Sequence, residues 1–150
     1  MYQTILVPLD GSKRAESILS HAASIAKSND AKVFFLKVEE EPIMLERDEV
    51  IDVEKYHEMF EKQNALSQAY LDDLQAGFHE KGIQAVTTLA FGSVVKAILN
   101  TAAETGTDLI AMATHGLSGL ARVSYGSVAA GVLQAADIPI LLIRSGSDKN

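Results

Sequence analysis

Glycine and serine residues gather in one stretch, MATHGLSGLARVSYGSV, which spans residues 112–128. The stretch follows an apolar segment typical of a buried strand and leads into a helical pattern. Glycines let the backbone come close to a ligand, and the free N–H groups at the start of a helix attract anions. Arg122 adds a cation to the same stretch. The pattern predicts a phosphate-binding loop, and a plain glycine-rich connection is the alternative.

Two well-known phosphate-binding fingerprints are absent from the chain. There is no G-x-G-x-x-G, and no G-x-x-x-x-G-K-[ST]. Two segments, Gly77–Gly82 and Gly126–Gly131, have the glycine spacing of the second fingerprint. Ile83 and Val132 stand where its lysine would be. Any phosphate binding must therefore use a different loop.

Asp10 is the second candidate binding residue. It lies in the sequence VPLDGS, directly after an apolar segment and before a helical pattern. A carboxylate at the end of a strand accepts hydrogen bonds from two ribose hydroxyls. Its other possible role is to cap the local turn.

Residues typical of catalysis or metal binding are not arranged in a recognisable motif. There is no G-x-S-x-G nucleophile elbow and no H-E-x-x-H. Ser118 and Ser127 lie near His115 but have no orienting acid nearby, so phosphate binding explains them better. His115 could contact a ligand or hydrogen-bond the backbone. We therefore predict no catalytic residue and no protein metal ligand.

Five short apolar segments predict strands. Several of them are apolar on both faces, which is typical of a parallel sheet covered by helices on both sides. Strands are predicted at residues 4–8, 32–38, 84–89, 108–113 and 139–143.

Helical patterns fill the intervals between these strands. Apolar residues at helical spacing occur within residues 15–26, 59–74, 95–102 and 129–136. Ser12 and Ser93 are expected helix caps, and Pro139 is expected to stop the last helix. Strict alternation of strand and helix predicts an α/β domain over residues 1–150, with a doubly wound five-stranded parallel sheet. Ligands bind such sheets at the carboxyl ends of the strands.

Composition excludes several classes of protein. The formal net charge of −7 argues against a duplex-DNA binder. The absence of cysteine excludes disulfides and thiol chemistry. The start of the chain does not resemble a signal peptide, and the apolar run 138–143 is far shorter than the roughly 20 residues that span a bilayer. We therefore expect a cytoplasmic protein with neither nucleic-acid nor membrane partners.

Most of the negative charge lies in residues 39–55, which contain eight acidic and two basic residues. The same segment contains apolar residues such as Ile43 and Leu45. It could be a solvated connection that packs a few of these residues. The alternative is a mobile flap or a partner surface, since long connections are often functional.

Three stretches resemble the universal stress protein family: ILVPLDGS at the start, MATHGLSGLARVSYGSVA, and IPILLIR near the end. The resemblance covers nearly the whole chain. Members that bind ATP have the signature G-x2-G-x9-G-[ST]. The corresponding residues are Ala113, Gly116 and Gly126–Ser127, so the spacing is intact but alanine replaces the first glycine.

The resemblance implies a fold, a ligand and a partner. It implies the adenine nucleotide alpha hydrolase-like fold with strand order 3-2-1-4-5, and a homodimer joined through the last strand, residues 139–143. It also implies ATP, AMP or another adenine nucleotide as ligand, with Mg²⁺ at the phosphates. By resemblance, Asp10 holds the ribose with Pro8 and Leu9 beside it, Val38 lies against adenine, Met112 and Ala113 flank the nucleoside, and Gly116, Gly126, Ser127 and Val128 bind phosphates.

The first hypothesis is a stress-response regulator or sensor that binds ATP and hydrolyses it slowly at most, because no lysine or base is evident for the γ-phosphate. There are two rival hypotheses. One is a dimeric interaction protein of the same family that binds no nucleotide, motivated by Ala113 and the acidic segment 39–55. The other is an adenylating or pyrophosphate-releasing ligase on the same scaffold. The chain lacks the S-G-G-x-D-S and H-x-G-H motifs that such a ligase would be expected to show.

Overall fold

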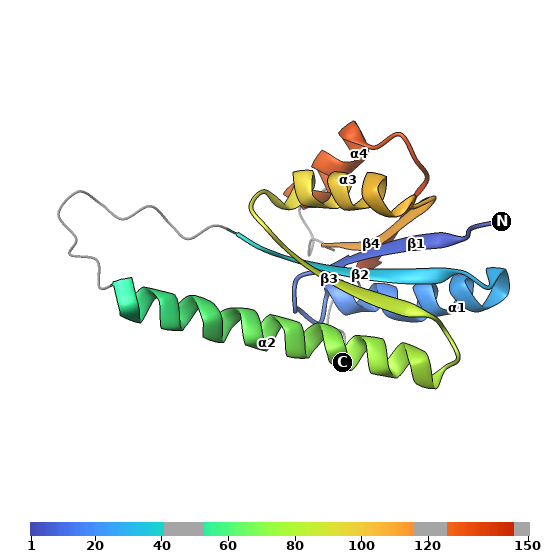
Figure 1. Cartoon of the computed structure of the whole chain (residues 1–150). Helices are drawn as coiled ribbons and strands as arrows, with labels where there is room; N and C mark the ends of the chain where they lie inside the picture. The colour runs from blue at the N-terminus through green and yellow to red at the C-terminus, as the bar shows by residue number, and fades with distance from the viewer. Residues whose placement is uncertain (41–52, 116–125, 146–150) are drawn as a thin grey trace.

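A single parallel sheet organises the chain (Figure 1). The computed structural model describes residues 1–40, 53–115 and 126–145. Within them, five strands pair in the order β3-β2-β1-β4-β5, and every pair is parallel. This confirms the predicted fold and strand order. The strands are β1 (Thr4–Leu9), β2 (Lys32–Glu39), β3 (Ala85–Phe91), β4 (Leu109–His115) and β5 (Ile140–Ser145).

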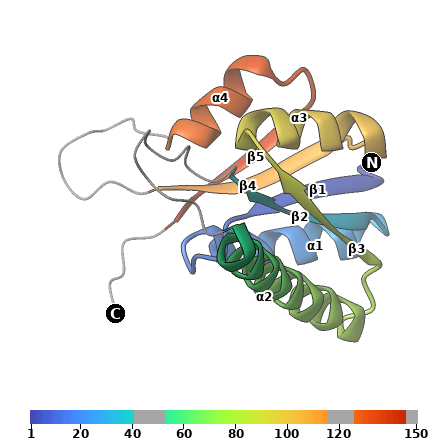
Figure 2. The ribbon, with the colours of Figure 1, turned by 60° about the vertical axis from the view of Figure 1, so that its left-hand side comes forward.

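Helices cover both faces of the sheet, as the alternating pattern predicted. Figure 2 shows α1 and α2 on one side of the sheet and α3 and α4 on the other. The long helix α2 runs past the end of the sheet (Figure 1). The helical elements are η1 (Ala15–Ile18), α1 (Leu19–Asn29), α2 (Val53–Glu80), α3 (Val94–Thr105) and α4 (Ser127–Ala135).

Two hydrophobic clusters, one on each face, hold these layers together. Because side chains alternate along a strand, β1 sends Ile5 and Val7 into the cluster under α1 and α2, and Leu6 into the cluster under α3 and α4. All three side chains are fully buried. The strands are apolar on both faces for this reason.

Helix boundaries follow the predicted signals in part. Ser12 Oγ accepts a hydrogen bond from the N–H of Ala15, the first residue of η1, at 3.2 Å, although Arg14 occupies the N-cap position itself. Ser93 occupies the N-cap position of α3, but its side chain makes no capping hydrogen bond there. Helix α4 ends at Ala135, before Pro139. Residues 41–52 of the acidic segment lie outside the described residues, whereas its last residues begin α2.

Helix α4 comes close to α3 at Gly131. A Cβ atom placed on Gly131 would lie 2.8 Å from Cγ2 of Val95. A Cβ could not fit at that distance unless Val95 shifted. Glycine at this position therefore allows α4 to pack closely against Val95 of α3.

Candidate functional site

A cavity of about 500 Å³ lies at the carboxyl ends of β1, β2 and β4. This volume falls within the range of small-molecule sites. The structure brings nine of the ten sequence-predicted site residues to its wall, from four separate parts of the chain. Gly116, the tenth, lies outside the described residues. The nine are Pro8, Leu9, Asp10, Val38, Met112, Ala113, Gly126, Ser127 and Val128.

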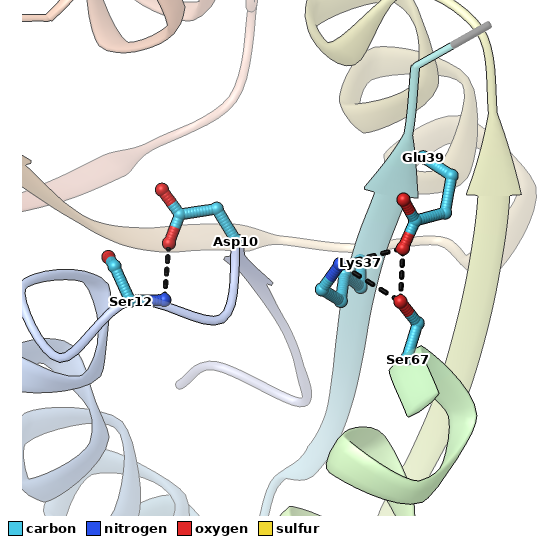
Figure 3. Close-up of polar contacts among 5 residues, drawn as sticks. All are labelled: Asp10, Ser12, Lys37, Glu39 and Ser67. Carbon is cyan, nitrogen blue, oxygen red and sulfur yellow. Dashed lines mark hydrogen bonds and ion pairs between the residues drawn. The ribbon is translucent and has the colours of Figure 1, made fainter. Parts of the chain in front are cut away.

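Asp10 stands where β1 ends and the chain turns toward α1 (Figure 3). Gly11 has φ = +89°, a conformation that favours glycine. Asp10 Oδ1 accepts a hydrogen bond from the backbone N–H of Ser12 at 2.8 Å. The carboxylate therefore does stabilise the local turn. A carboxylate accepts up to about four hydrogen bonds, so this bond is compatible with ribose binding by the same side chain.

One wall of the cavity is apolar. Val38 and Met112 both belong to the face of the sheet under α3 and α4. Val94 and Ile98 of α3 line the cavity from that same side. These side chains offer a dry surface on which a flat ring, such as a nucleobase, could pack.

The N-terminus of α4 also lines the cavity. The N-cap residue is Gly126, which has no side chain to cap the first N–H groups, and Ser127 begins the helix. The carbonyl of Gly126 already accepts the N–H of Ala130 at 3.0 Å. The first turn of a helix directs N–H groups and a partial positive charge outward. This end of the cavity is therefore suited to an anion.

A lysine, a glutamate and a serine form a polar network at the rim that the sequence did not predict (Figure 3). Lys37 Nζ lies 2.7 Å from Glu39 Oε1 and 3.0 Å from Oγ of Ser67, a buried residue of α2. Ser67 also hydrogen-bonds Glu39. Lys37 and Glu39 line the cavity. The one sequence signal was two charged residues at strand spacing, which places them on one face of β2.

The network changes the acidity of Glu39. Burial of the carboxyl raises its pKa, but hydrogen bonds from Lys37 and Ser67 and the charge of Lys37 act in the opposite direction. Together they outweigh burial, and the pKa of Glu39 lies below its ordinary value. The folded protein therefore stabilises the ionised form of Glu39 more than the unfolded chain does.

This lowered pKa predicts a pH-dependent contribution to stability. A depressed carboxyl pKa stabilises the folded state above the unfolded pKa, and the contribution disappears as the pH falls through the folded value. At pH 7 the free energy of unfolding should be larger for wild type than for Glu39→Gln. The difference between the two should shrink below about pH 4. Urea unfolding across pH measures it. Glu80→Gln, at an exposed carboxylate of α2, controls for the change in charge, and a difference independent of pH would contradict the prediction.

Other sequence features contribute less to the site. His115 ends β4, and the chain from Gly116 to Tyr125 is outside the described residues. Among the residues the structure describes, no group of three or more His, Cys, Asp or Glu side chains is placed to hold a metal ion. No helix in the described ranges has the length and apolarity to cross a membrane.

Comparison with known proteins gives consistent matches over the whole chain. The family model described as "Universal stress protein family" matches residues 1–144. Universal stress protein YxiE of Bacillus subtilis is 32% identical over 149 residues, which covers 96% of this chain and 100% of the relative. The solved structure of hypothetical protein MJ0577 superposes with a TM-score of 0.81 at 26% identity and covers 99% of both chains.

Two further solved structures share the fold and carry ligands. A universal stress protein in complex with cAMP matches with a TM-score of 0.71 at 23% identity, covering 97% of this chain and 98% of the other. An Arabidopsis thaliana family protein with AMP bound matches with a TM-score of 0.70 at 18% identity, covering 98% and 94%. At these identities the likeness concerns the fold alone.

Proposed function

Because this chain belongs to the universal stress protein family, we propose that it binds an adenine nucleotide in the cavity at the carboxyl ends of β1, β2 and β4. The proposal rests on one observation, which is the set of residues that line this cavity. The lining combines an apolar wall, the carboxylate of Asp10 and the N-terminus of α4. A nucleobase, a ribose and a phosphate need these three surfaces in turn.

Each part of the nucleotide has a proposed contact. Adenine packs against Val38 and Met112, and Asp10 accepts hydrogen bonds from the ribose hydroxyls. The phosphates lie at Gly126–Val128, where backbone N–H groups and the Ser127 hydroxyl donate to them. Pro8, Leu9 and Ala113 flank the nucleoside, and Gly116 joins the phosphate contacts.

ATP with Mg²⁺ is the proposed physiological form of the ligand. Relatives that carry cAMP or AMP support an adenine nucleotide in general. When bound, Mg²⁺ neutralises phosphate charge, and it commonly uses phosphate oxygens, water and one or two carboxylates as ligands. The described residues fit that mode better than an all-protein metal site, because no cluster of metal ligands occurs among them.

Hydrolysis of the bound ATP is proposed to be slow at most. Lys37 lines the cavity, but it is held in an ion pair with Glu39. It therefore differs from the phosphate-binding lysine of a P-loop, which contacts the β- and γ-phosphates. We propose a cytoplasmic stress-response regulator or sensor, formed by a single domain over residues 1–150. Its bound nucleotide changes a dimer or partner surface.

The edge strand β5 is the proposed dimer interface. It is apolar from Ile140 to Ile143, and these side chains are only half-buried. The N–H of Ile110 on β4 donates to the carbonyl of Pro139. Alternate residues of a strand hydrogen-bond the same neighbouring strand. Because the carbonyl of Pro139 faces β4, the backbone N–H and C=O of Leu142, three residues further on, point away from β4. An open apolar edge invites pairing with another strand.

Pairing of two β5 strands predicts a dimer that proline can disrupt. Leu142→Pro removes an outward N–H, and an edge strand tolerates proline. Sedimentation velocity at micromolar concentration should give a dimer for wild type and a monomer for Leu142→Pro, with unchanged circular dichroism. A monomeric wild type, or a dimeric variant, would remove β5 as the interface.

Mass spectrometry separates the nucleotide-binding proposal from the rival interaction protein. The purified chain is denatured, and the small molecules it releases are identified. Adenine nucleotide in near-equal amount to the protein supports the proposal. Ala113 motivates the rival, because its methyl group lines the cavity where ATP-binding members have glycine. Ala113→Gly is therefore the matched variant. Under the rival hypothesis wild type should release no nucleotide, and if the methyl group is what excludes the ligand, Ala113→Gly should release it.

A further inference from the structure

The first half of helix α2 carries an apolar face that the sheet does not cover. Figure 1 shows α2 running past the end of the sheet. In its second half, Leu71 and Phe78 pack on the core and are 0% and 3% exposed. Val53 and Phe60 precede them by about five helical turns, so they lie on the same face of α2. They are 69% and 37% exposed. The apolar face of the helix therefore continues beyond the core that buries it.

A small cleft lies between this part of α2 and the end of β2. Its volume is about 190 Å³, below the roughly 300 Å³ at which small-molecule sites begin. The cleft therefore has the size for one side chain of a partner better than for a free ligand. It is lined by Glu39, Glu40, Tyr56, Met59, Phe60, Gln63 and Asn64.

The cleft and the exposed apolar side chains around it form one surface, which we call the α2 patch. Met59 is 65% exposed, and the ring of Phe60 lies beside that of Phe91 of β3, with centroids 5.8 Å apart. Exposed apolar side chains that gather in this way mark an interaction site. The apolar members of the α2 patch are Val53, Tyr56, Met59, Phe60 and Phe91.

Acidic residues adjoin the α2 patch. Glu39 is paired with Lys37, whereas Glu40 forms no ion pair with another residue in the described ranges. Glu54 and Glu58 are exposed on the first turns of α2. The segment 39–55, whose two ends lie at the patch, contains eight acidic and two basic residues. The charge that complements this surface is positive.

A second copy of the chain fits the α2 patch poorly. A two-fold interface places the same surface on both sides, so the acidic residues of one copy would face those of the other. Like charges across an interface disfavour association. The proposed dimer strand β5 lies at the opposite edge of the sheet from β3, so pairing through β5 leaves the α2 patch open.

We propose that the α2 patch docks a basic and apolar peptide segment of another protein. An apolar side chain of that segment fills the cleft beside Met59 and Phe60, and a lysine or arginine next to it pairs with Glu40. This inference does not depend on the proposed nucleotide function. Glu39 and Glu40 also line the larger cavity, so the docked segment lies next to the proposed nucleotide site.

A fluorescein-labelled peptide of lysine, leucine and serine is the probe for this surface. Fluorescence anisotropy measures its binding to wild-type protein freed of nucleotide, and the binding should saturate. Replacing the leucines of the peptide with serine should weaken binding, because nothing then fills the cleft. Replacing the lysines with glutamate should abolish it, because like charges then meet.

Variants of the protein locate the binding on the α2 patch. Met59→Ser should weaken binding of the peptide about tenfold, the effect of losing one buried methionine contact. Glu40→Gln should weaken it about threefold, as expected for one exposed ion pair. Leu133→Ser, at an exposed leucine of α4, and Glu80→Gln, at the far end of α2, are the matched controls and should bind like wild type. If Met59→Ser does not fold, Tyr56→Ser removes another wall of the same cleft.

Three results would overturn the inference. The first is wild type that does not bind the peptide. The second is equal binding by wild type, Met59→Ser and Glu40→Gln, which would mean that the acidic chain as a whole attracts the peptide. The third is a smaller oligomer for Met59→Ser than for wild type in sedimentation velocity without peptide, which would mean that a second copy covers the patch. None of these results bears on ATP binding, which is measured separately.

Discussion

Replacing Asp10 with asparagine is expected to weaken ATP binding by about 10- to 100-fold, the effect of losing one hydrogen bond to a charged group. Asparagine has the same shape, and its oxygen can still accept the N–H of Ser12, which Asp10 accepts at 2.8 Å. The turn after β1 should therefore survive. The second oxygen becomes an amide nitrogen, which donates and cannot accept from a ribose hydroxyl. Isothermal titration calorimetry with ATP measures the loss.

Deoxynucleotides make the Asp10 test specific for the ribose. Wild type should bind ATP more tightly than 2′-deoxyATP, because one hydroxyl partner of Asp10 is missing from the deoxy form. Asp10→Asn should lose most of this preference, since the two changes remove the same interaction. Asp73→Asn, at an exposed position on α2, is the matched control and should bind like wild type. An Asp10→Asn variant with wild-type affinity would leave Asp10 as a turn residue only.

Phe35→Ala should lower the free energy of unfolding by about 3–5 kcal/mol, the range for removing a buried phenylalanine. Phe35 is fully buried in the cluster under α1 and α2. Its ring meets Phe78 of α2 edge-on, with ring centroids 4.8 Å apart. Alanine leaves a cavity there and removes the ring contact. Urea unfolding followed by circular dichroism measures the loss.

The same variant tests whether the core and the candidate site are separate. Phe35 faces α1 and α2, whereas its neighbour Leu36 packs under α3 and lines the cavity. The folded Phe35→Ala protein should therefore bind ATP nearly as well as wild type. Phe60→Ala, at a partly exposed ring of α2, is the control and should cost far less stability. A loss below about 1 kcal/mol for Phe35→Ala would contradict its place in the core.

The sheet could be predicted well from sequence because its signals are local. Strands buried on both faces are apolar throughout, and turns and helix ends separate them. The N-terminus of α2 was harder to place. That helix begins at Val53, inside the acidic segment 39–55, whereas the apolar pattern became regular only near Met59. The first turns of α2 are rich in charged residues, so they lack the apolar stripe by which a helix is recognised in a sequence.

The candidate site was predictable where parallel-sheet geometry alone brings residues together. The ends of β1, β2 and β4 meet at one edge of the sheet, so Asp10, Val38 and Met112 come together there. Thr114 and Lys37 were not predicted. A threonine or lysine in a strand is equally compatible with solvent, and only the packing of the neighbouring elements shows that Thr114 is buried and that Lys37 is paired with Ser67 of α2.

Titration of the purified wild-type chain with ATP and Mg²⁺ tests the nucleotide site most directly. Calorimetry on protein freed of any retained nucleotide should show saturation with one ATP per chain. Competition should then show that AMP displaces ATP, whereas GTP, with a different base facing the apolar wall at Val38, displaces it poorly. Absence of saturation up to millimolar ATP would contradict the nucleotide site and leave this cavity without its proposed ligand.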